Sequence, residues 1–245
     1  MLDKKDIKYF NIGKYENIKF WKRLGGKPDL KEKKVLDFGC GHGSLCLDIA
    51  LSGAKLVNGI DLEDDLLKFA NENLEINFKN FKDKVRFQKI NILEKEINQK
   101  FDFIVSKDTF EHTINLEEVL KKMHNLLNDG GKAYLGFGPL YNFYNGDHGR
   151  TLMYLPWFHL LFSDQFIINR VNKKSNLQIN KIEDLGLNKY SFKDYEKIIK
   201  NSNFQIKFYI TNQSDHPISK IFNLLSKLKI FKEYCTYNIY CILQK

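Results

Sequence analysis

The sequence predicts an α/β protein built on a doubly wound, mostly parallel sheet. Short apolar runs alternate with segments of helical spacing from residue 34 to residue 137, which is typical of strands joined by covering helices. A glycine-rich turn follows the first apolar run. The chain has 245 residues, 43% of them hydrophobic, which suits one such domain and is too short for two full-sized ones. Residues 1–245 are therefore expected to form a single domain.

Residues 1–30 are expected to form a helical lid or brace. Residues 7–10 and 15–24 have amphipathic spacing, which predicts one or two short helices, and Gly25 and Gly26 end the segment. The start has no apolar leader, and no later run approaches the ~18 to 20 apolar residues of a membrane span. We therefore expect a cytoplasmic protein with no stable membrane insertion.

Strands and helices then alternate. Each expected strand is a short apolar run, and each expected helix carries apolar residues at helical spacing. The strands are expected at 34–38, 56–60, 85–90, 101–106 and 131–137, and the helices at 44–52, 64–77 and 116–127.

The stretch 139–190, after the fifth strand, interrupts this alternation. It is rich in aromatic residues, His and Asn, and its clear helical run is 155–162. Connections of this length are usually functional, so we expect an insertion that covers the substrate. The remaining elements are expected to be helix 191–201, capped by Ser191, strand 204–211, basic amphipathic helix 218–230 and strand 236–243.

The chain is basic, with 39 Lys and Arg against 30 Asp and Glu, a net charge of +9. Such a charge favours anionic partners. The positive residues are spread along the whole chain without a basic-aromatic motif, so we expect a phosphorylated or sugar-containing small acceptor rather than nucleic acid. The four cysteines lie in apolar stretches without CxxC spacing and are expected to be reduced core residues.

The turn from Gly39 to Gly43 is the sharpest local feature. Its GxGxG spacing lies between an apolar run and a helical segment, so the backbone can approach a ligand at the positive end of a helix. A dinucleotide fingerprint would need a third glycine where the chain has Ser44. Asp37 precedes the turn, and Asp61 closes the next strand at a distance typical of a ribose-binding carboxylate. These residues predict a nucleoside ligand.

These ordered segments resemble the class I S-adenosylmethionine-dependent methyltransferases, from residue 33 to residue 243. The glycine turn is similar to the family's first motif, 101–113 to its fourth and 126–137 to its paired-glycine strand. The resemblance implies a Rossmann-like seven-stranded sheet with an antiparallel last strand, and S-adenosyl-L-methionine as cofactor, released as S-adenosyl-L-homocysteine. It also implies the cofactor-binding residues, which are Asp37, Gly39, Cys40, Gly41, Gly43, Asp61, Leu62, Asn91, Ile92, Lys107, Asp108 and His112.

In that resemblance, Asp61 corresponds to the acid that binds ribose, and 88–93 to the segment that brackets adenine. Asn91 stands where an Asp is common in the family, and its amide can still present a carbonyl acceptor. The fourth motif lacks the [DNS]PP[YFW] of enzymes that methylate base amino groups. Glu111 and His112 instead resemble the EH pair of small-molecule methyltransferases for quinones and natural products. His112 either fixes the loop beside the cofactor or acts in catalysis.

Candidate acceptor-site residues cluster in 138–163. His148 is our preferred general base, with a loop-structuring role as the alternative. His159 lies on an apolar helical run, so it is either catalytic or a core histidine. Arg150 could pair with a substrate phosphate or remain solvated. The five candidates for the catalytic site are Tyr144, His148, Arg150, His159 and His112, and their spacing matches no zinc motif, so no metal is expected.

The insertion also resembles that of methyltransferases from bacterial surface-polysaccharide gene clusters. We therefore expect O-methylation of an anionic sugar, nucleotide-linked or phosphoryl precursor of a surface glycan. One alternative is a quinone-type, lipid-linked or other small-molecule methyltransferase, with 218–230 as an interfacial helix or an ordinary crossover helix packed on the sheet. Another alternative is an RNA methyltransferase or a non-catalytic nucleic-acid-binding module.

Overall fold

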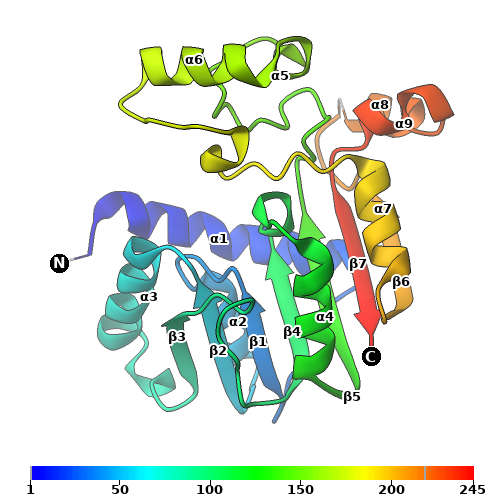
Figure 1. Cartoon of the computed structure of the whole chain (residues 1–245). Helices are drawn as coiled ribbons and strands as arrows, with labels where there is room; N and C mark the ends of the chain where they lie inside the picture. The colour runs from blue at the N-terminus through cyan, green and yellow to red at the C-terminus, as the bar shows by residue number, and fades with distance from the viewer. Residues whose placement is uncertain (1, 218) are drawn as a thin grey trace.

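The computed structural model describes residues 2–217 and 219–245. They are built around one seven-stranded sheet (Figure 1). The strands are β1 (Lys34–Phe38), β2 (Leu56–Asp61), β3 (Val85–Lys89), β4 (Phe101–Lys107), β5 (Leu127–Phe137), β6 (Gln205–Thr211) and β7 (Ile239–Gln244). Their order is β3-β2-β1-β4-β5-β7-β6. The first five strands pair in parallel, and β7 is antiparallel to both neighbours. The expected fold class is confirmed.

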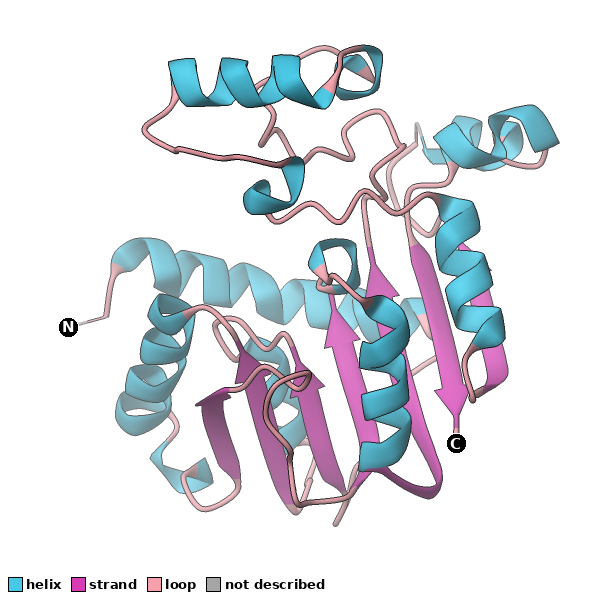
Figure 2. Ribbon diagram, viewed as in Figure 1, coloured by secondary structure: helices cyan, strands magenta, loops and turns pink. Residues whose placement is uncertain are grey.

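Helices cover both faces of this sheet (Figure 2). The covering helices are α1 (Lys4–Arg23), α2 (Ser44–Leu51), α3 (Asp64–Asn77), α4 (Leu116–Leu126) and α7 (Phe192–Asn201). The first three pack on one face, and α4 and α7 on the other. In α4, Leu116, Val119, Leu120 and Met123 recur at helical spacing and are all buried, so one stripe of the helix joins the core. Ser191 caps α7 as expected, in a reciprocal box with Asp194.

One continuous helix, α1, replaces the one or two short helices expected before residue 25. It begins after the cap Asp3, whose carboxylate accepts from the Lys5 N–H. The helix continues through Gly13, where an added Cβ would stand 2.4 Å from Ser44 Oγ. Its C-terminal half buries Phe20 and Trp21 in the core. This half is a brace for the sheet, and the N-terminal half reaches the glycine turn.

The insertion contains more helix than expected. Instead of one helix over 155–162, the structure has α5 (Phe158–Leu161), α6 (Asp164–Lys174) and a 3₁₀ helix, η3 (Ile182–Leu185). The N-cap Ser163 accepts from the Phe166 N–H and starts α6. The insertion has its own small apolar core, formed by Tyr141, Ile167, Ile168, Val171, Ile179, Ile182, Leu185 and Leu187.

Two short helices, α8 (Ser219–Leu225) and α9 (Lys229–Cys235), replace the single helix expected over 218–230. The first expected residue, Ile218, lies outside the described residues. No residue of α8 is buried, so the interpretation of this segment as a crossover helix packed on the sheet is wrong for 219–225. Among the described residues, no helix is long and apolar enough to cross a membrane.

Candidate functional site

The glycine-rich turn joins β1 to α2 at the edge where the parallel strands end (Figure 1). The N–H groups of Gly39 and Cys40 donate to the Ile60 carbonyl at 2.9 and 3.0 Å. Gly39 has a φ of +77°, and a Cβ there would lie 2.2 Å from Thr109 Oγ1. Only glycine fits this close approach. A Cβ on Gly41 would meet no atom within 4 Å, so the turn is open above Gly41.

Asp61 directs its carboxylate at this turn. Its Oδ2 accepts from the Gly41 N–H at 2.8 Å. Its Oδ1 accepts from the N–H groups of Leu62 and Glu63 at 2.7 and 3.0 Å, at the start of α3. Three N–H donors stabilise the negative charge and fix its orientation. The Leu62 side chain beside it is exposed, where it could pack on a planar ligand.

Asp37 lies beneath the turn rather than on it. The side chain is buried, and Cys46 Sγ donates to its Oδ2 at 3.1 Å. Burial raises the pKa of Asp37 to about 7, against the lowering effects of the Cys46 bond and of Lys107. Cys40 and Cys46 pack on Gly59, and all four cysteines of the chain are free and buried. Asp37 is placed to support the turn from within the core.

Asn91 follows β3 and uses its amide locally. Its Oδ1 accepts from the Leu93 N–H at 3.1 Å, and its Nδ2 donates to Glu94 Oε1 at 2.8 Å. The carbonyl keeps a second lone pair for a ligand. Ile92 beside it is buried. The expected adenine contact of this pair stays a prediction.

Lys107 and Asp108 end β4 on the side that faces α1. Lys107 Nζ donates to Asn17 Oδ1 at 2.8 Å, which ties β4 to α1. Burial lowers the pKa of Lys107 and raises that of Asp108. Asp108 has a φ of +55°, and its N–H donates to the Gly136 carbonyl at 2.8 Å. The chain therefore turns sharply between β4 and the EH pair.

Two residues of α1 that the sequence did not single out lie against the turn. The ring of Tyr9 is 4.6 Å from the ring of His42 between centroids. Asp6 Oδ1 is 3.2 Å from His42 Nε2. His42 itself is buried within the GxGxG segment. The N-terminal half of α1 therefore covers the glycine turn. No sequence motif marks the contact between Asp6 and His42, because 36 residues separate them.

The structure brings His112 and His148 together, with 4.8 Å between ring centroids. His112 Nδ1 lies 2.6 Å from the Gly186 carbonyl, and His148 Nε2 lies 3.2 Å from the Pro139 carbonyl. Because a carbonyl only accepts, each of these nitrogens carries the proton and the other ring nitrogen is a free base. Burial lowers the pKa of His148 and lowers that of His112 to about 4. Both rings are therefore neutral at neutral pH.

Glu111 lies beside this pair, and the sequence named it only as part of the EH motif. One oxygen, Oε1, accepts from the Gly138 N–H at 3.1 Å. The other, Oε2, is buried without a hydrogen-bond partner among the described residues. Burial, and then the Asp108 carboxyl, raise the pKa of Glu111 well above its usual range. A buried carboxyl oxygen without a partner is suited to receive a ligand's polar group.

Arg150, in the insertion, contacts the same backbone carbonyl as His112. Its Nη1 donates to the carbonyls of Leu185 and Gly186, at 2.7 and 3.2 Å. The Gly186 oxygen also accepts from His112. Arg150 therefore has a positioning role in addition to any contact with an anionic acceptor.

Tyr144 and His159 contact groups other than the two histidine rings. The Tyr144 ring packs with Phe143, Trp157 and Phe222. His159 is fully buried, and its Nε2 donates to the Tyr141 carbonyl at 2.7 Å. This geometry favours the core-histidine interpretation of His159. The catalytic roles of both residues stay predictions.

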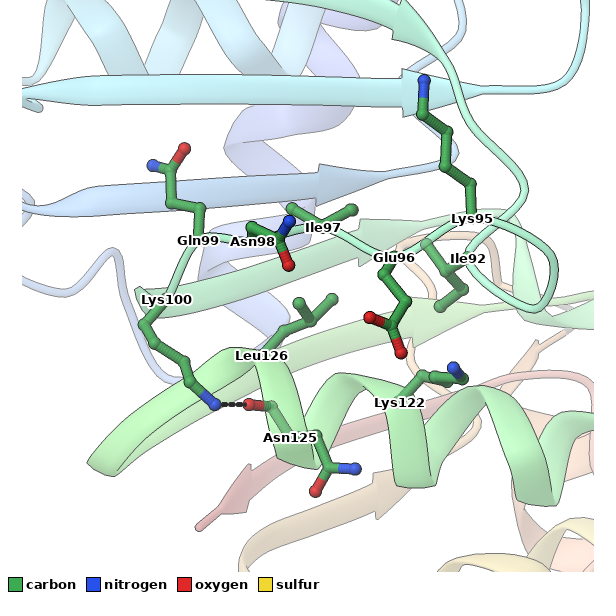
Figure 3. A pocket seen from close by; sticks show the side chains of 10 residues that line it. All are labelled: Ile92, Lys95, Glu96, Ile97, Asn98, Gln99, Lys100, Lys122, Asn125 and Leu126. Carbon is green, nitrogen blue, oxygen red and sulfur yellow. Dashed lines mark hydrogen bonds between the residues drawn. The ribbon is translucent and has the colours of Figure 1, made fainter.

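A cavity of about 360 Å³ lies apart from this site, between the segment after Asn91 and α4 (Figure 3). Lys95, Glu96 and Lys122 line the cavity, and Lys100 Nζ, also in its lining, donates to the Asn125 carbonyl. It shares only Ile92 with the expected cofactor site. Among the described residues, no group of three His, Cys, Asp or Glu side chains is arranged to hold a metal ion.

Residues 29–136 match a family model described as a methyltransferase domain. This match covers less than half of the chain. The match runs from before β1 to Gly136 in β5, so it contains the glycine turn, Asp61 and the EH pair. It ends before the insertion, so His148 and Arg150 lie outside the matched region and His112 lies inside it.

Relatives of known name match a similar share of the chain. The ubiquinone biosynthesis O-methyltransferase of Coxiella burnetii is 35% identical over 105 residues, covering 43% of this chain and 43% of that protein. The chain thus spans less than half the length of this relative. The names of these relatives refer to ubiquinone biosynthesis and not to surface polysaccharides.

Solved structures share the fold of the whole chain. A methyltransferase structure from Listeria monocytogenes, described as putative and S-adenosylmethionine dependent, has a TM-score of 0.60 at 18% identity and covers 96% of this chain and 99% of that chain. Magnesium protoporphyrin IX methyltransferase from Synechocystis, with bound S-adenosylhomocysteine, has a TM-score of 0.57 at 16% identity and covers 100% and 88%. The chain therefore has the Rossmann-like methyltransferase fold, and α5, α6, α8 and α9 lie at one end of the molecule (Figure 1).

Proposed function

We propose that this protein is an S-adenosylmethionine-dependent methyltransferase that acts on an oxygen of a small molecule with an aromatic, quinone-type ring. The observation that carries the proposal is the Asp61 carboxylate, held 2.8 Å from the Gly41 N–H at a turn that is open above Gly41. A carboxylate beside a glycine turn suits a nucleoside whose ribose hydroxyls need acceptors. The methyltransferase-domain match over 29–136 supports the same cofactor class.

The residues at the turn fit the cofactor. Gly39 and Gly41 leave the backbone accessible, and Asp61 offers its second lone pairs to the ribose hydroxyls. In this proposal, Asn91 and Leu62 flank the adenine ring of the cofactor. S-adenosylmethionine supplies an activated methyl group on a sulfonium when bound. The Asp108 and Glu111 carboxyls are buried and have raised pKa values. A bound sulfonium near them would lower these pKa values.

The acceptor side is suited to a ring hydroxyl. A phenolic O–H has a pKa of about 10 and must lose its proton as the methyl–oxygen bond forms. His148 offers an unprotonated Nδ1 at neutral pH, because its Nε2 faces the Pro139 carbonyl and burial lowers its pKa. Glu111 Oε2 is free to hold a second polar group of the ring. His148 is therefore the base in this proposal, and Glu111 orients the acceptor.

The named relatives support the acceptor class. They act in ubiquinone biosynthesis by name and transfer to oxygen. The insertion adds a cluster of Phe143, Tyr144 and Trp157 near the same end of the sheet, which suits an apolar ring better than a sugar.

Calorimetry with S-adenosylhomocysteine tests the cofactor assignment. Wild type should bind, and Asp61→Asn should bind about 10- to 100-fold more weakly, because a charged hydrogen-bond acceptor is lost. Asp65→Asn is the matched control, since Asp65 is an exposed acid in the first turn of α3. No heat with wild type would refute the cofactor assignment. Equal losses in both variants would refute the role of Asp61.

Methyl transfer from labelled S-adenosylmethionine tests the acceptor. We expect label on a dihydroxybenzene or hydroquinone acceptor and none on a nucleotide sugar. Label on the nucleotide sugar alone would overturn the quinone-type acceptor and leave the cofactor assignment standing.

A further inference from the structure

The segment between β6 and β7 presents a row of apolar side chains to solvent. Six large apolar residues of α8, α9 and the turn between them are 44% to 76% exposed. An exposed apolar surface of this kind marks an interaction site more often than a scattered single residue does. We call this surface the α8–α9 patch, and its members are Ile221, Leu224, Leu228, Ile230, Phe231 and Tyr234.

The patch is held in place from beneath, so its exposure is a property of the fold. Phe222 points into the insertion, with its ring 4.8 Å from Phe143 and 5.7 Å from Tyr144 between centroids. Glu233 Oε1 accepts from the Phe192 N–H at 2.6 Å and from Asn142 Nδ2 at 3.0 Å. The aromatic contacts of Phe222 therefore anchor α8, and the Glu233 carboxylate anchors α9. The six residues of the patch stay exposed.

Positive charge surrounds the patch. Residues 219–235 contain four lysines and one acid, and that acid, Glu233, is the inward anchor. Lys232 lies 3.4 Å from Glu196. The side chains of the other three, Lys220, Lys227 and Lys229, are exposed and make no ion pair within the described residues. Apolar side chains interleaved with lysines are the composition of a helix that lies in a membrane interface.

We propose that the α8–α9 patch docks the protein on an anionic lipid bilayer, with both short helices lying in the interface. Charge complementarity favours a lipid surface over an uncharged protein face. The patch adjoins the insertion through Phe222, and α8, α9, α5 and α6 lie at the same end of the molecule (Figure 1). Docking would bring the acceptor side of the domain to the bilayer, and this link to an apolar acceptor rests on the proposed function.

Vesicle flotation tests the docking with the whole chain and no cofactor. Wild type should bind phosphatidylcholine vesicles that contain phosphatidylglycerol, more weakly as salt rises, and bind poorly to pure phosphatidylcholine. Ile230→Glu should lose at least ~10-fold in affinity, since burying an isoleucine is worth that much. Lys227→Glu/Lys229→Glu should lose at least ~25-fold, at about 5-fold for each lysine removed and more from the repulsion of the new carboxylates.

The matched controls carry the same changes elsewhere. Ile76→Glu alters another exposed isoleucine, on α3, and Lys79→Glu/Lys84→Glu alters two exposed lysines away from the patch. Both should bind like wild type. Equal losses in the controls, or no binding by wild type, would overturn the proposal. A dimer on size exclusion that Ile230→Glu dissolves, without vesicle binding, would assign the patch to a second copy instead.

Calorimetry with S-adenosylhomocysteine on the same preparations separates this inference from the proposed function. Vesicle binding without S-adenosylhomocysteine binding would refute only the cofactor assignment. S-adenosylhomocysteine binding without vesicle binding would refute only the docking.

Discussion

The glycine turn and the insertion meet at the same end of the sheet, yet different interactions fix them. The turn is held by backbone bonds to β2, by the Asp61 carboxylate and by the close fit of Gly39 against Thr109. Each of these depends on buried strands whose register cannot shift without moving the core. The cofactor side is therefore rigid, and its geometry follows from the sheet.

The insertion is held to the rest of the chain mostly by side-chain contacts. Asn188 Nδ2 donates to the Phe110 and Thr113 carbonyls, and His112 donates to the Gly186 carbonyl. Such side-chain contacts tolerate exchange of the segment they hold. In the proposed function, the sheet fixes the cofactor side, and the choice of acceptor falls to an insertion that can change without disturbing the sheet.

The largest expected effect comes from filling the turn. Gly39→Ala places a Cβ 2.2 Å from Thr109 Oγ1 at a φ of +77°. We expect at least a ~100-fold loss of S-adenosylhomocysteine affinity and about 2–4 kcal/mol of stability, from strain and overpacking together. Calorimetry and thermal unfolding measure the two effects.

Gly149→Ala is the matched change in the insertion. Gly149 has a φ of +72°, and an added Cβ would meet no atom within 4 Å. Only the backbone strain of about 1 kcal/mol should remain. If both variants lose the same affinity for S-adenosylhomocysteine, the contrast between the two regions is wrong.

The next largest effect tests whether the insertion takes part in the chemistry. His148→Asn removes the base but keeps a side chain that tolerates the φ of +53° and can donate to the Pro139 carbonyl. We expect kcat to fall ~100-fold with unchanged S-adenosylhomocysteine affinity. The wild-type rate should fall on acidification only below the ordinary histidine pKa, because burial lowers that of His148.

His112→Asn is the comparison within the matched domain. It should keep the bond to the Gly186 carbonyl through the amide N–H and lower kcat less than His148→Asn. A larger effect from His112→Asn would move the base from the insertion to the EH pair.

The same contrast decided what the sequence could predict. The strands from β1 to β5 and the positions of Gly39 and Asp61 follow from local apolar runs and glycine spacing. The contact of His112 with His148 joins segments 36 residues apart through two backbone carbonyls, and no local pattern encodes such a meeting. The sequence marked Glu111 only as part of the EH pair. That its Oε2 is buried without a hydrogen-bond partner among the described residues depends on the tertiary fold, which the motif does not encode.

Helices were mispredicted where no sheet imposed a face. The start of α6 was readable from Ser163 before Asp164, with apolar Ile167, Ile168 and Val171 following at helical spacing. The break between α8 and α9 has no proline or glycine to announce it. Instead, Phe222 of α8 packs on Phe143 of the insertion, and Glu233 of α9 accepts from the N–H at the start of α7. These tertiary contacts override the helical pattern of the sequence.

The pH dependence of stability should differ in sign between Asp37 beneath the glycine turn and His112 in the histidine pair. Burial raises the pKa of Asp37 to about 7, so the folded state holds a proton that the unfolded state loses, and stability falls as pH rises from about 4 to about 7. Asp37→Asn should therefore be more stable than wild type at pH ~8 by about 2 kcal/mol, or roughly 4–8 °C in Tm. The difference should disappear near pH ~4.

His112 should act in the opposite direction and more weakly. Its folded pKa of about 4 lies below the ordinary 6.5, so the unfolded state binds the proton first and stability falls as pH drops from 6.5 toward 4. Because the ring is partly exposed and solvent screens it, we expect wild type to lose about 1 kcal/mol more than His112→Asn between pH ~7 and ~5. Thermal unfolding across this window measures both variants. Parallel curves for wild type and His112→Asn would mean that His112 is solvated in the folded protein, and the neutral histidine pair would lose its physical basis.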